Sequence, residues 1–261
     1  TATPEAALQN EVLALVLWGA NVRAEASTES EIVTWADAGR DFRVTTQDVV
    51  NHELWYQVAL PDGGNGWLHS STSSLVSLWS RVVETFDDVE MVLVPAGCFP
   101  MGSVDTESEE DERPIYVQCF DEPFWVDRYE VSNLAYGSAG RWSGNLQPRE
   151  SIDWFAASEY CAARGARLLT EAEWEYAARG PVAPIYPWGN EFVDDNVVSS
   201  WWNTARSTEI VTGRPGGASW VGALNMSGNV WEWTSSIYAD YPFDPTDGRE
   251  DVEDTFSPRV V

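Results

Sequence analysis

The chain has 261 residues, of which 44% are hydrophobic and 15 are tryptophan, and its formal net charge is −27. This charge excludes partners with phosphate backbones and disfavours anionic membrane surfaces, because both would be repelled. All 15 Lys and Arg positions are arginine, which excludes Schiff-base chemistry and a P-loop lysine, and the only imidazoles are His52 and His69. The acidity indicates either a chain kept soluble outside a cell or an electrostatic field that attracts divalent cations.

The first ten residues are polar and do not begin with methionine. We interpret the chain as a mature protein from which a signal or anchor segment was removed, which predicts a location outside the cell or at its surface. No apolar run reaches the length of a membrane span. The three cysteines form no CxxC motif, which argues against structural zinc and favours an oxidising exterior where two of them pair.

Residues 12–77 alternate short strand-like pieces with glycine turns, which predicts a small all-β barrel. Four segments stand out: "NVRAEAS" (21–27), Gly39, "WYQV" (55–58) and "GWLHS" (66–70). These segments resemble the bacterial SH3-like (SH3b) domains, which implies either binding to cell-wall peptides or a spacer role. We expect His52 and His69 to lie at the surface or in turns, and residues 78–89 to form a linker.

A second domain is expected over residues 90–261. It opens with a strand, a turn and a strand at 91–103, and an acidic loop at 105–112 separates these from further strands. We expect Cys98 and Cys119 to form a disulfide, because they lie on the two strands that flank the loop and each is followed by phenylalanine. The acidic loop is either a cation site or a solvated hairpin tip.

The first of two predicted helices follows Ser151, which can cap it. Trp154, Ala157 and Cys161 fall at i, i+3 and i+7 of this segment. This spacing predicts one buried stripe along the helix.

The second predicted helix begins at Thr170, and Glu173 completes a capping box with it. We expect Trp174 and Ala177 to face inward and Gly180 to end the helix. Four glutamates of the two helices are expected on a solvated face: Glu159, Glu171, Glu173 and Glu175.

Six longer motifs occur in the second domain: "PAGCFPMGS" (95–103), "DERP" (111–114), "FWVDRYEVSN" (124–133), "YCAARGARLLTEAEWEYAARG" (160–180), "YPWGN" (186–190) and "MSGNVWEWT" (226–234). In this order they resemble the formylglycine-generating-enzyme sulfatase-modifying family. The resemblance implies an α+β chain, in which the SH3-like barrel precedes a loop-rich variant of the C-type lectin fold. The family includes copper-dependent oxidases that form formylglycine from cysteine, iron-dependent sulfoxide synthases, maturation factors and non-catalytic members, so it leaves the function open.

The segment "GNVWEW" (228–233) places two tryptophans around one glutamate. By the resemblance, calcium would be held by the Asn225 side chain, the Gly228 and Val230 carbonyls and the Glu232 carboxylate, an oxygen set that suits this ion. We expect Trp231 and Trp233 to pack beneath the loop. Alternatively, Glu232 accepts from buried backbone N–H groups among the indoles.

A second calcium site of the family begins with an Asn-apolar pair, which Asn196-Val197 matches, although the following region offers no matching acid. Two further clusters have simpler alternatives. Residues 244–254 are either a calcium loop or a solvated acidic loop, and their spacing does not fit an EF-hand. The pair Trp201-Trp202 either stacks on a sugar or belongs to a core.

Two classes of function stay open. The first is a non-catalytic extracellular or cell-surface module that binds a protein, a peptide or a glycan, or assembles with itself, with calcium as a structural ion and with no nucleic-acid partner and no membrane span. The second is a formylglycine-generating copper oxidase seen without its catalytic C-terminal segment, since the chain ends at "SPRVV" (257–261), where the family's Arg-Gly-Gly-Ser-Trp segment would begin. Copper would then require a cysteine pair carried by the missing segment, and the family counterpart of Cys161 pairs with a cysteine near the domain's end.

Overall fold

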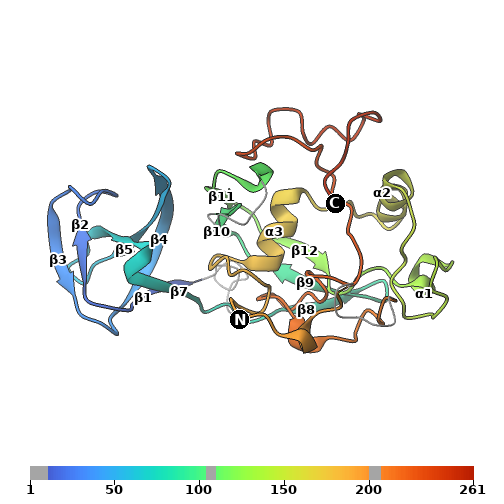
Figure 1. Cartoon of the computed structure of the whole chain (residues 1–261), viewed down its shortest axis with the longest axis horizontal. Coiled ribbons are helices and arrows are strands. Elements are labelled where there is room, and N and C mark those ends of the chain that lie inside the picture. Colours follow the sequence, from blue (N-terminus) through green and yellow to red (C-terminus); the bar gives the residue numbers. More distant parts are fainter. Residues whose placement is uncertain (1–10, 104–109, 200–206) are drawn as a thin grey trace, which may run out of the picture. The chain divides into compact units, whose positions relative to one another are not determined.

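The computed structural model describes residues 11–103, 110–199 and 207–261. The pair Trp201-Trp202 and most of the acidic loop 105–112 lie outside the described residues. The chain divides into two compact units, each of which is treated by itself (Figure 1). Unit 1 comprises the described part of Thr1–Ser80, Pro95–Pro123 and Pro181–Ala183, and unit 2 comprises Arg81–Val94, Phe124–Gly180 and Pro184–Val261. The expected domain boundaries at 12–77, 78–89 and 90–261 stay predictions.

Unit 1 contains a seven-stranded antiparallel sheet with the strand order β3-β2-β6-β5-β4-β1-β7 (Figure 1). Alternation along β5 illustrates the pattern, since Tyr56 and Val58 belong to the apolar core with Val22 and Leu68. The strands are β1 (Val12–Val16), β2 (Ala20–Arg23), β3 (Ile32–Ala36), β4 (Asp41–Val50), β5 (Glu53–Ala59), β6 (Asn65–His69) and β7 (Ser73–Ser77).

Both histidines lie at the ends of strands of this sheet. Asn51 and His52, with φ of 54° and 67°, form the two-residue turn between β4 and β5, and His52 is exposed, as expected. His69 ends β6, and its Nδ1 accepts from the backbone N–H of Ser71 at 3.2 Å. Its ring meets that of Trp55 edge-on at 4.8 Å between centroids. Both positions have local structural roles.

A disulfide-bonded hairpin completes unit 1. Strands β10 (Gly97–Met101) and β11 (Tyr116–Phe120) pair antiparallel, and their register places Cys98 opposite Cys119, which form the expected disulfide. The amide nitrogen of Gln47, on β4, donates to the backbone oxygens of Cys98 at 3.4 Å and of Pro181 at 3.3 Å. The hairpin is therefore joined to the sheet by a buried side chain as well as by the chain itself.

The described residues of unit 2 form a three-stranded antiparallel sheet, three α-helices and long loops, which with unit 1 confirms the α+β class. Strand β8 lies inside the range expected to be a linker. Helices α1 and α2 are neighbours in Figure 1, and the rings of Tyr136 and Tyr160 lie 5.0 Å apart between centroids. The elements are β8 (Val83–Phe86), β9 (Val89–Val94), β12 (Phe124–Asp127), α1 (Asn133–Tyr136), α2 (Trp154–Ala163) and α3 (Glu171–Arg179).

The start of α2 corrects the expected cap. Asp153, rather than Ser151, is the N-cap residue, and its carboxylate accepts from the backbone N–H of Ala156 at 2.8 Å. Ser151 has a φ of 60°, which takes it out of the extended conformation that an N-cap adopts. Trp154 is buried as predicted, whereas the Cys161 thiol at the other end of the stripe is only half-buried.

The ends of α3 follow the prediction. Thr170 and Glu173 form the reciprocal capping box, with bonds of 3.1 and 2.9 Å. Gly180 ends the helix with a φ of 63°, and a Cβ at this position would lie 2.7 Å from the Trp220 indole. Glycine is required here both for the backbone and for the close indole.

The expected solvated face of glutamates is wrong for three of its four members. Glu173 is 7% exposed and is bonded by Arg167 at 2.6 Å, while Glu175 pairs with Arg179. Glu171 is half-buried, and only Glu159 is exposed. The error arises because loops that are distant in sequence cover α3, which helical spacing alone does not reveal.

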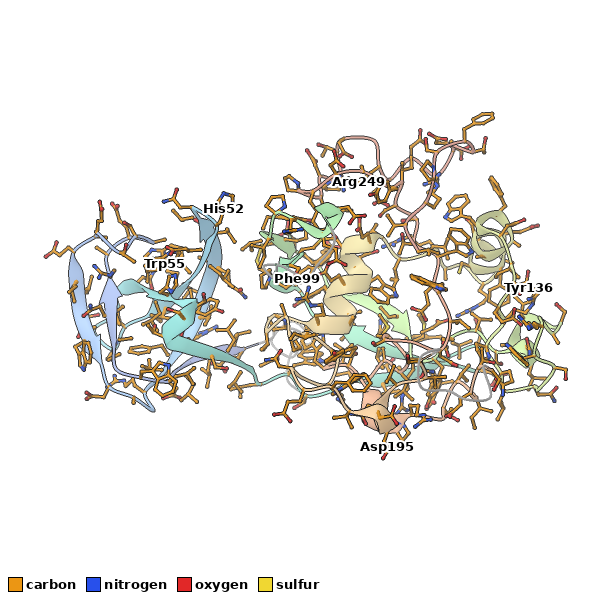
Figure 2. The ribbon with its side chains drawn as sticks, in the orientation of Figure 1. His52, Trp55, Phe99, Tyr136, Asp195 and Arg249 are labelled. Atoms are coloured by element: carbon orange, nitrogen blue, oxygen red, sulfur yellow. A yellow bond between two sulfur atoms is a disulfide. The ribbon has the colours of Figure 1, made fainter. Side chains whose placement is uncertain are left out.

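The C-terminal segment 235–261 is held by arginines. Arg249 is only 4% exposed, lies 4.9 Å over the Phe243 ring and donates to the backbone oxygen of Asp240 at 3.0 Å (Figure 2). Glu250 accepts from the hydroxyl of Ser235 at 2.7 Å. The stretch 244–254, one expectation for which was a solvated acidic loop, is thus exposed at Asp244, Asp247 and Asp251 but anchored at Arg249 and Glu250. Over the described ranges, no helix is long and apolar enough to cross a membrane.

Glu171 lies against this segment, and its Oε1 accepts from the Tyr241 hydroxyl at 2.9 Å. Burial is the main reason that the pKa of Glu171 is raised to about 7, and the charge of Glu175 adds to it. A carboxyl whose pKa is higher in the folded state than in the unfolded state favours folding at low pH. This contribution is lost as the pH rises from the ordinary value through about 7.

We therefore predict that Glu171→Gln stabilises the protein relative to the wild type at pH 8 and much less at pH 4.5. The difference in the free energy of unfolding should grow by up to about 3 kcal/mol across this interval. Urea unfolding of both proteins at several pH values measures it. Glu159→Gln, which removes an exposed charge, is the control, and a Glu171→Gln curve parallel to the wild-type curve would contradict the prediction.

Candidate functional site

The loop 225–230 is built on left-handed backbone. Asn225, Gly228 and Asn229 have φ values of 60°, 90° and 65°. The backbone N–H of Asn229 donates to the Val198 oxygen at 2.8 Å, and a Cβ on Gly228 would lie 2.4 Å from the same oxygen. Glycine at 228 therefore lets the loop come close to the segment that contains Val197, so the structure brings part of the two predicted calcium motifs together.

Two asparagine amides of this loop converge on one carboxylate. The side-chain nitrogens of Asn225 and Asn229 each donate to Glu130 Oε2 at 2.8 Å. Burial raises the pKa of Glu130 to about 8, and the negative charge of Glu232 adds to the rise. The other oxygen, Oε1, is buried without a hydrogen-bond partner among the described residues. Sequence reasoning missed Glu130, and the only signal was a charged residue in the quoted "FWVDRYEVSN" motif.

Glu232 has a different indole partner from the expected ones. Its Oε2 accepts from Trp174 Nε1, on α3, at 2.5 Å. Burial, with a smaller contribution from the charge of Asp127, raises the pKa of Glu232 to about 7. Trp231 is 84% exposed, so the expectation that it packs beneath the loop is wrong. Trp233 is half-buried and donates to the backbone oxygen of Ile152 at 3.1 Å.

The donors near this loop suit a hard cation in their chemistry. Glu130 and Glu232 supply buried carboxylates, one of them with a free oxygen, and calcium takes oxygen ligands of this kind. No group of three Asp, Glu, His or Cys side chains that could hold a metal occurs in the described residues, so backbone carbonyls would have to complete a shell. The amide nitrogen of Asn225 is committed to Glu130 and to the Val211 oxygen, which leaves its own oxygen as the available donor.

The other predicted pair lies on a separate short turn. Asn196 ends a 3₁₀ turn at Asp194–Asn196, and its side-chain oxygen lies against Gly216, where a Cβ would be 2.3 Å away. Its backbone oxygen lies equally close to Gly217. Asn196 therefore has a packing role in the structure, and its role as a calcium ligand together with Val197 stays a prediction.

A cavity of about 970 Å³ lies next to the loop and belongs wholly to unit 2. Its walls include Glu130, Glu232 and Cys161. In the part of the chain that the structure describes, five tryptophans also line it: Trp125, Trp142, Trp174, Trp231 and Trp233. Since Trp231 is both exposed and part of the lining, it offers an indole face to a molecule that enters the cavity.

The single free thiol of the chain lies in this cavity. Burial raises the pKa of Cys161, and the opposing effects of Arg164 and Asp127 are smaller. Arg164 is bound to Asp127 by two hydrogen bonds of 2.7 and 2.9 Å, so its charge is already engaged. A thiol in this setting stays protonated at neutral pH, which suits packing rather than nucleophilic attack.

Comparison with known proteins agrees with the expected resemblances. A model described as "Sulfatase-modifying factor enzyme 1-like domain" matches residues 80–253, and one described as "Bacterial SH3 domain" matches residues 18–74. A solved structure of PvdO from Pseudomonas aeruginosa is similar with a TM-score of 0.53 and 27% identity, covering 61% of this chain and 76% of that one.

Three curated relatives show the spread of function among similar proteins. An inactive C-alpha-formylglycine-generating enzyme 2 of Mus musculus is 40% identical over 101 residues, covering 35% of this chain and 32% of the relative. A hercynine oxygenase of Mycobacterium tuberculosis is 40% identical over 100 residues, covering 37% and 23%. The formylglycine-generating enzyme of Mus musculus is 25% identical over 240 residues, covering 65% and 62%. The chain thus spans less than two thirds of the length of each relative.

The exposure of Trp231 generates a prediction about stability. Trp231→Ala should change the free energy of unfolding by less than about 0.5 kcal/mol, as for other exposed side chains. Trp174→Phe should cost about 1–3 kcal/mol, because it removes the indole N–H that the buried Glu232 carboxylate accepts. Denaturant unfolding of the two variants measures the contrast. A larger loss for Trp231→Ala than for Trp174→Phe would show that Trp231 is a core residue after all.

Proposed function

Because the chain belongs to the sulfatase-modifying factor enzyme 1-like family over residues 80–253, we propose that it is a non-catalytic member that binds a ligand in the cavity of unit 2. The family contains both enzymes and a protein named as inactive, so membership does not decide between catalysis and binding. The observation that carries the proposal is the combination of an aromatic, partly exposed cavity with a single protonated thiol.

Copper does not fit the cysteines of this chain. A soft ion such as Cu(I) is held by thiolates, and an oxidase of this family would need two of them. Cys98 and Cys119 are bonded to each other, which leaves Cys161 alone. The two histidines both belong to unit 1, where His52 forms part of the turn between β4 and β5 and His69 accepts a hydrogen bond from Ser71. The copper-oxidase alternative therefore depends on a cysteine pair that residues 1–261 do not contain.

Calcium fits the loop beside the cavity, and we include it in the proposal as a structural ion. Asn225, Gly228, Val230 and Glu232 would hold it, with Glu130 as an additional carboxylate. When bound, calcium would supply a fixed positive charge that offsets the two buried carboxylates. The chain's own contribution is the left-handed loop and the Trp174 N–H, which hold the carboxylates in place.

We further propose that the module acts outside the cell or at its surface. The Cys98–Cys119 disulfide supports a non-cytoplasmic location, and a net charge of −27 supports solubility there. The bacterial SH3 domain matched over residues 18–74 supports a partner at the cell surface, of protein, peptide or glycan nature, and self-assembly is an outcome to be tested alongside.

Removal of calcium should destabilise the protein. At a calcium concentration 100 times the dissociation constant, binding adds about 2.7 kcal/mol to the folded state, so a chelator should lower the melting temperature measurably. Glu232→Gln should abolish this sensitivity, whereas the exposed control Glu159→Gln should retain it. A wild-type melting temperature that does not respond to chelator would count against the site.

The non-catalytic proposal is tested by an activity assay. A copper-loaded sample of the chain, incubated under oxygen with a cysteine-containing sulfatase peptide, should leave the peptide mass unchanged, because Cys161 lacks a second thiolate partner. An active formylglycine-generating enzyme serves as the positive control. Conversion of the peptide cysteine to an aldehyde would overturn the proposal and favour the oxidase.

A further inference from the structure

Among the described residues, four arginines line the cavity, and they differ in how their charges are engaged. Arg164 is bound to Asp127 through two hydrogen bonds, and Arg167 is bound to Glu173 through two of 2.6 Å each. These two form the bidentate pairs that neutralise a guanidinium inside a protein. The other two are Arg141 and Arg149.

Neither Arg141 nor Arg149 forms an ion pair with any residue in the described ranges. The guanidinium of Arg149 lies 4.9 Å over the ring of Tyr136, which Figure 2 labels, and its Nη1 donates to the backbone oxygen of Glu150. Its Nε is buried without a hydrogen-bond partner among the described residues. Arg141 is exposed and lies 5.1 Å over the Trp142 ring.

The carboxylate of Glu150 is bonded mainly to other groups, and the charge of Arg149 is one of the smaller causes that lower its pKa. Glu150 Oε1 accepts from the backbone N–H of Trp142 at 3.1 Å, and Oε2 accepts from the hydroxyl of Ser151. The bond from Trp142 to Glu150 connects the segment that contains Arg141 to the segment that contains Arg149. The Glu150 carboxylate thus holds the two arginine-bearing segments together.

A carboxylate that enters the cavity could accept charge-assisted bonds from the guanidinium groups of Arg141 and Arg149, which line it. The indoles of Trp142 and Trp231, on the same cavity, suit an apolar body attached to that carboxylate. A polyanion is disfavoured, because Glu130 and Glu232 also line the cavity and the chain as a whole is strongly negative.

We propose that Arg141 and Arg149 form an anion-recognition site that selects ligands with one carboxylate joined to an aromatic or similarly large apolar group. The inference rests on the proposed function of the cavity as a binding site and names the class of ligand. The carboxylate belongs either to a free small molecule or to a peptide, since both present the same group to the arginines.

The test uses the whole chain and matched pairs of probes in isothermal titration calorimetry. N-acetyl-L-tryptophan carries a carboxylate, and N-acetyl-L-tryptophanamide is its neutral counterpart. The acid should bind about tenfold more tightly than the amide, as expected for one hydrogen-bonded charge pair. A blocked tetrapeptide with adjacent Asp and Trp, compared with its Asn analogue, distinguishes a peptide source from a small-molecule source.

Single variants distinguish the contribution of the arginine charges to binding from the contribution of the apolar cavity wall. Arg149→Gln should reduce the affinity for the acid to that for the amide, and the exposed Arg141→Gln should reduce it by a smaller factor without any risk to folding. Arg40→Gln, which removes a guanidinium that lies over Phe42 in unit 1, should change neither affinity. Trp231→Ala should weaken acid and amide by the same factor, because the indole face contacts the apolar body of both.

The outcomes distinguish this inference from the proposed function. Equal binding of acid and amide to the wild type would overturn the anion site while leaving the cavity as a binding site. Failure of both probes to bind, at concentrations up to their solubility, would overturn the two together. An acid preference that survives both arginine variants would also overturn the assignment, since another cation would then be responsible.

Discussion

Two carboxylates buried side by side set the main constraint on unit 2. Burial raises the pKa of both Glu130 and Glu232, and the charge of Glu232 adds to the rise at Glu130. Much of the surrounding structure supplies hydrogen-bond donors to them: the asparagines of a left-handed loop for Glu130, and an indole from α3 for Glu232. The loop can take this shape because a glycine lies against the neighbouring backbone at Val198. Without the two carboxylates, neither the strained loop nor the placement of Trp174 would have an evident reason.

The features that local sequence encodes were predicted, and those that depend on distant contacts were not. The capping box at Thr170, the glycine stop at Gly180 and the turn at His52 are all decided within a few residues. The pairing of Glu130 with Asn225 spans 95 positions, and no pattern in either segment points to the other. The exposure of Trp231 was missed for the same reason. A hydrophobic side chain is buried only where other segments of the fold pack against it, and the local sequence does not show which segments do so. Asp153 rather than Ser151 caps α2 because the φ of Ser151 is 60°, which the sequence alone does not reveal.

In this chain, arginine side chains donate hydrogen bonds to backbone oxygens that regular secondary structure would satisfy in other folds. Loop-rich backbone leaves many carbonyl groups without ladder partners, and a guanidinium offers five donors in a fixed plane. Arg81 donates to the backbone oxygens of Ser219 and Trp220, and Arg259 donates to those of Asp251 and Asp254. This use of arginine explains how a strongly acidic chain holds long loops in place. Arg149 follows the same pattern, since it donates to the backbone oxygen of Glu150.

The assignment of Pro95–Pro123 and Pro181–Ala183 to unit 1 has a consequence for the order of events during synthesis. The polypeptide leaves the ribosome from its N-terminus, and domains usually fold in that order. Here the sheet of residues 12–77 is made before Cys98 and well before Pro181, whose backbone oxygens accept from the Gln47 amide. The bond from Gln47 to Pro181 can therefore form only after a further 134 residues have been made.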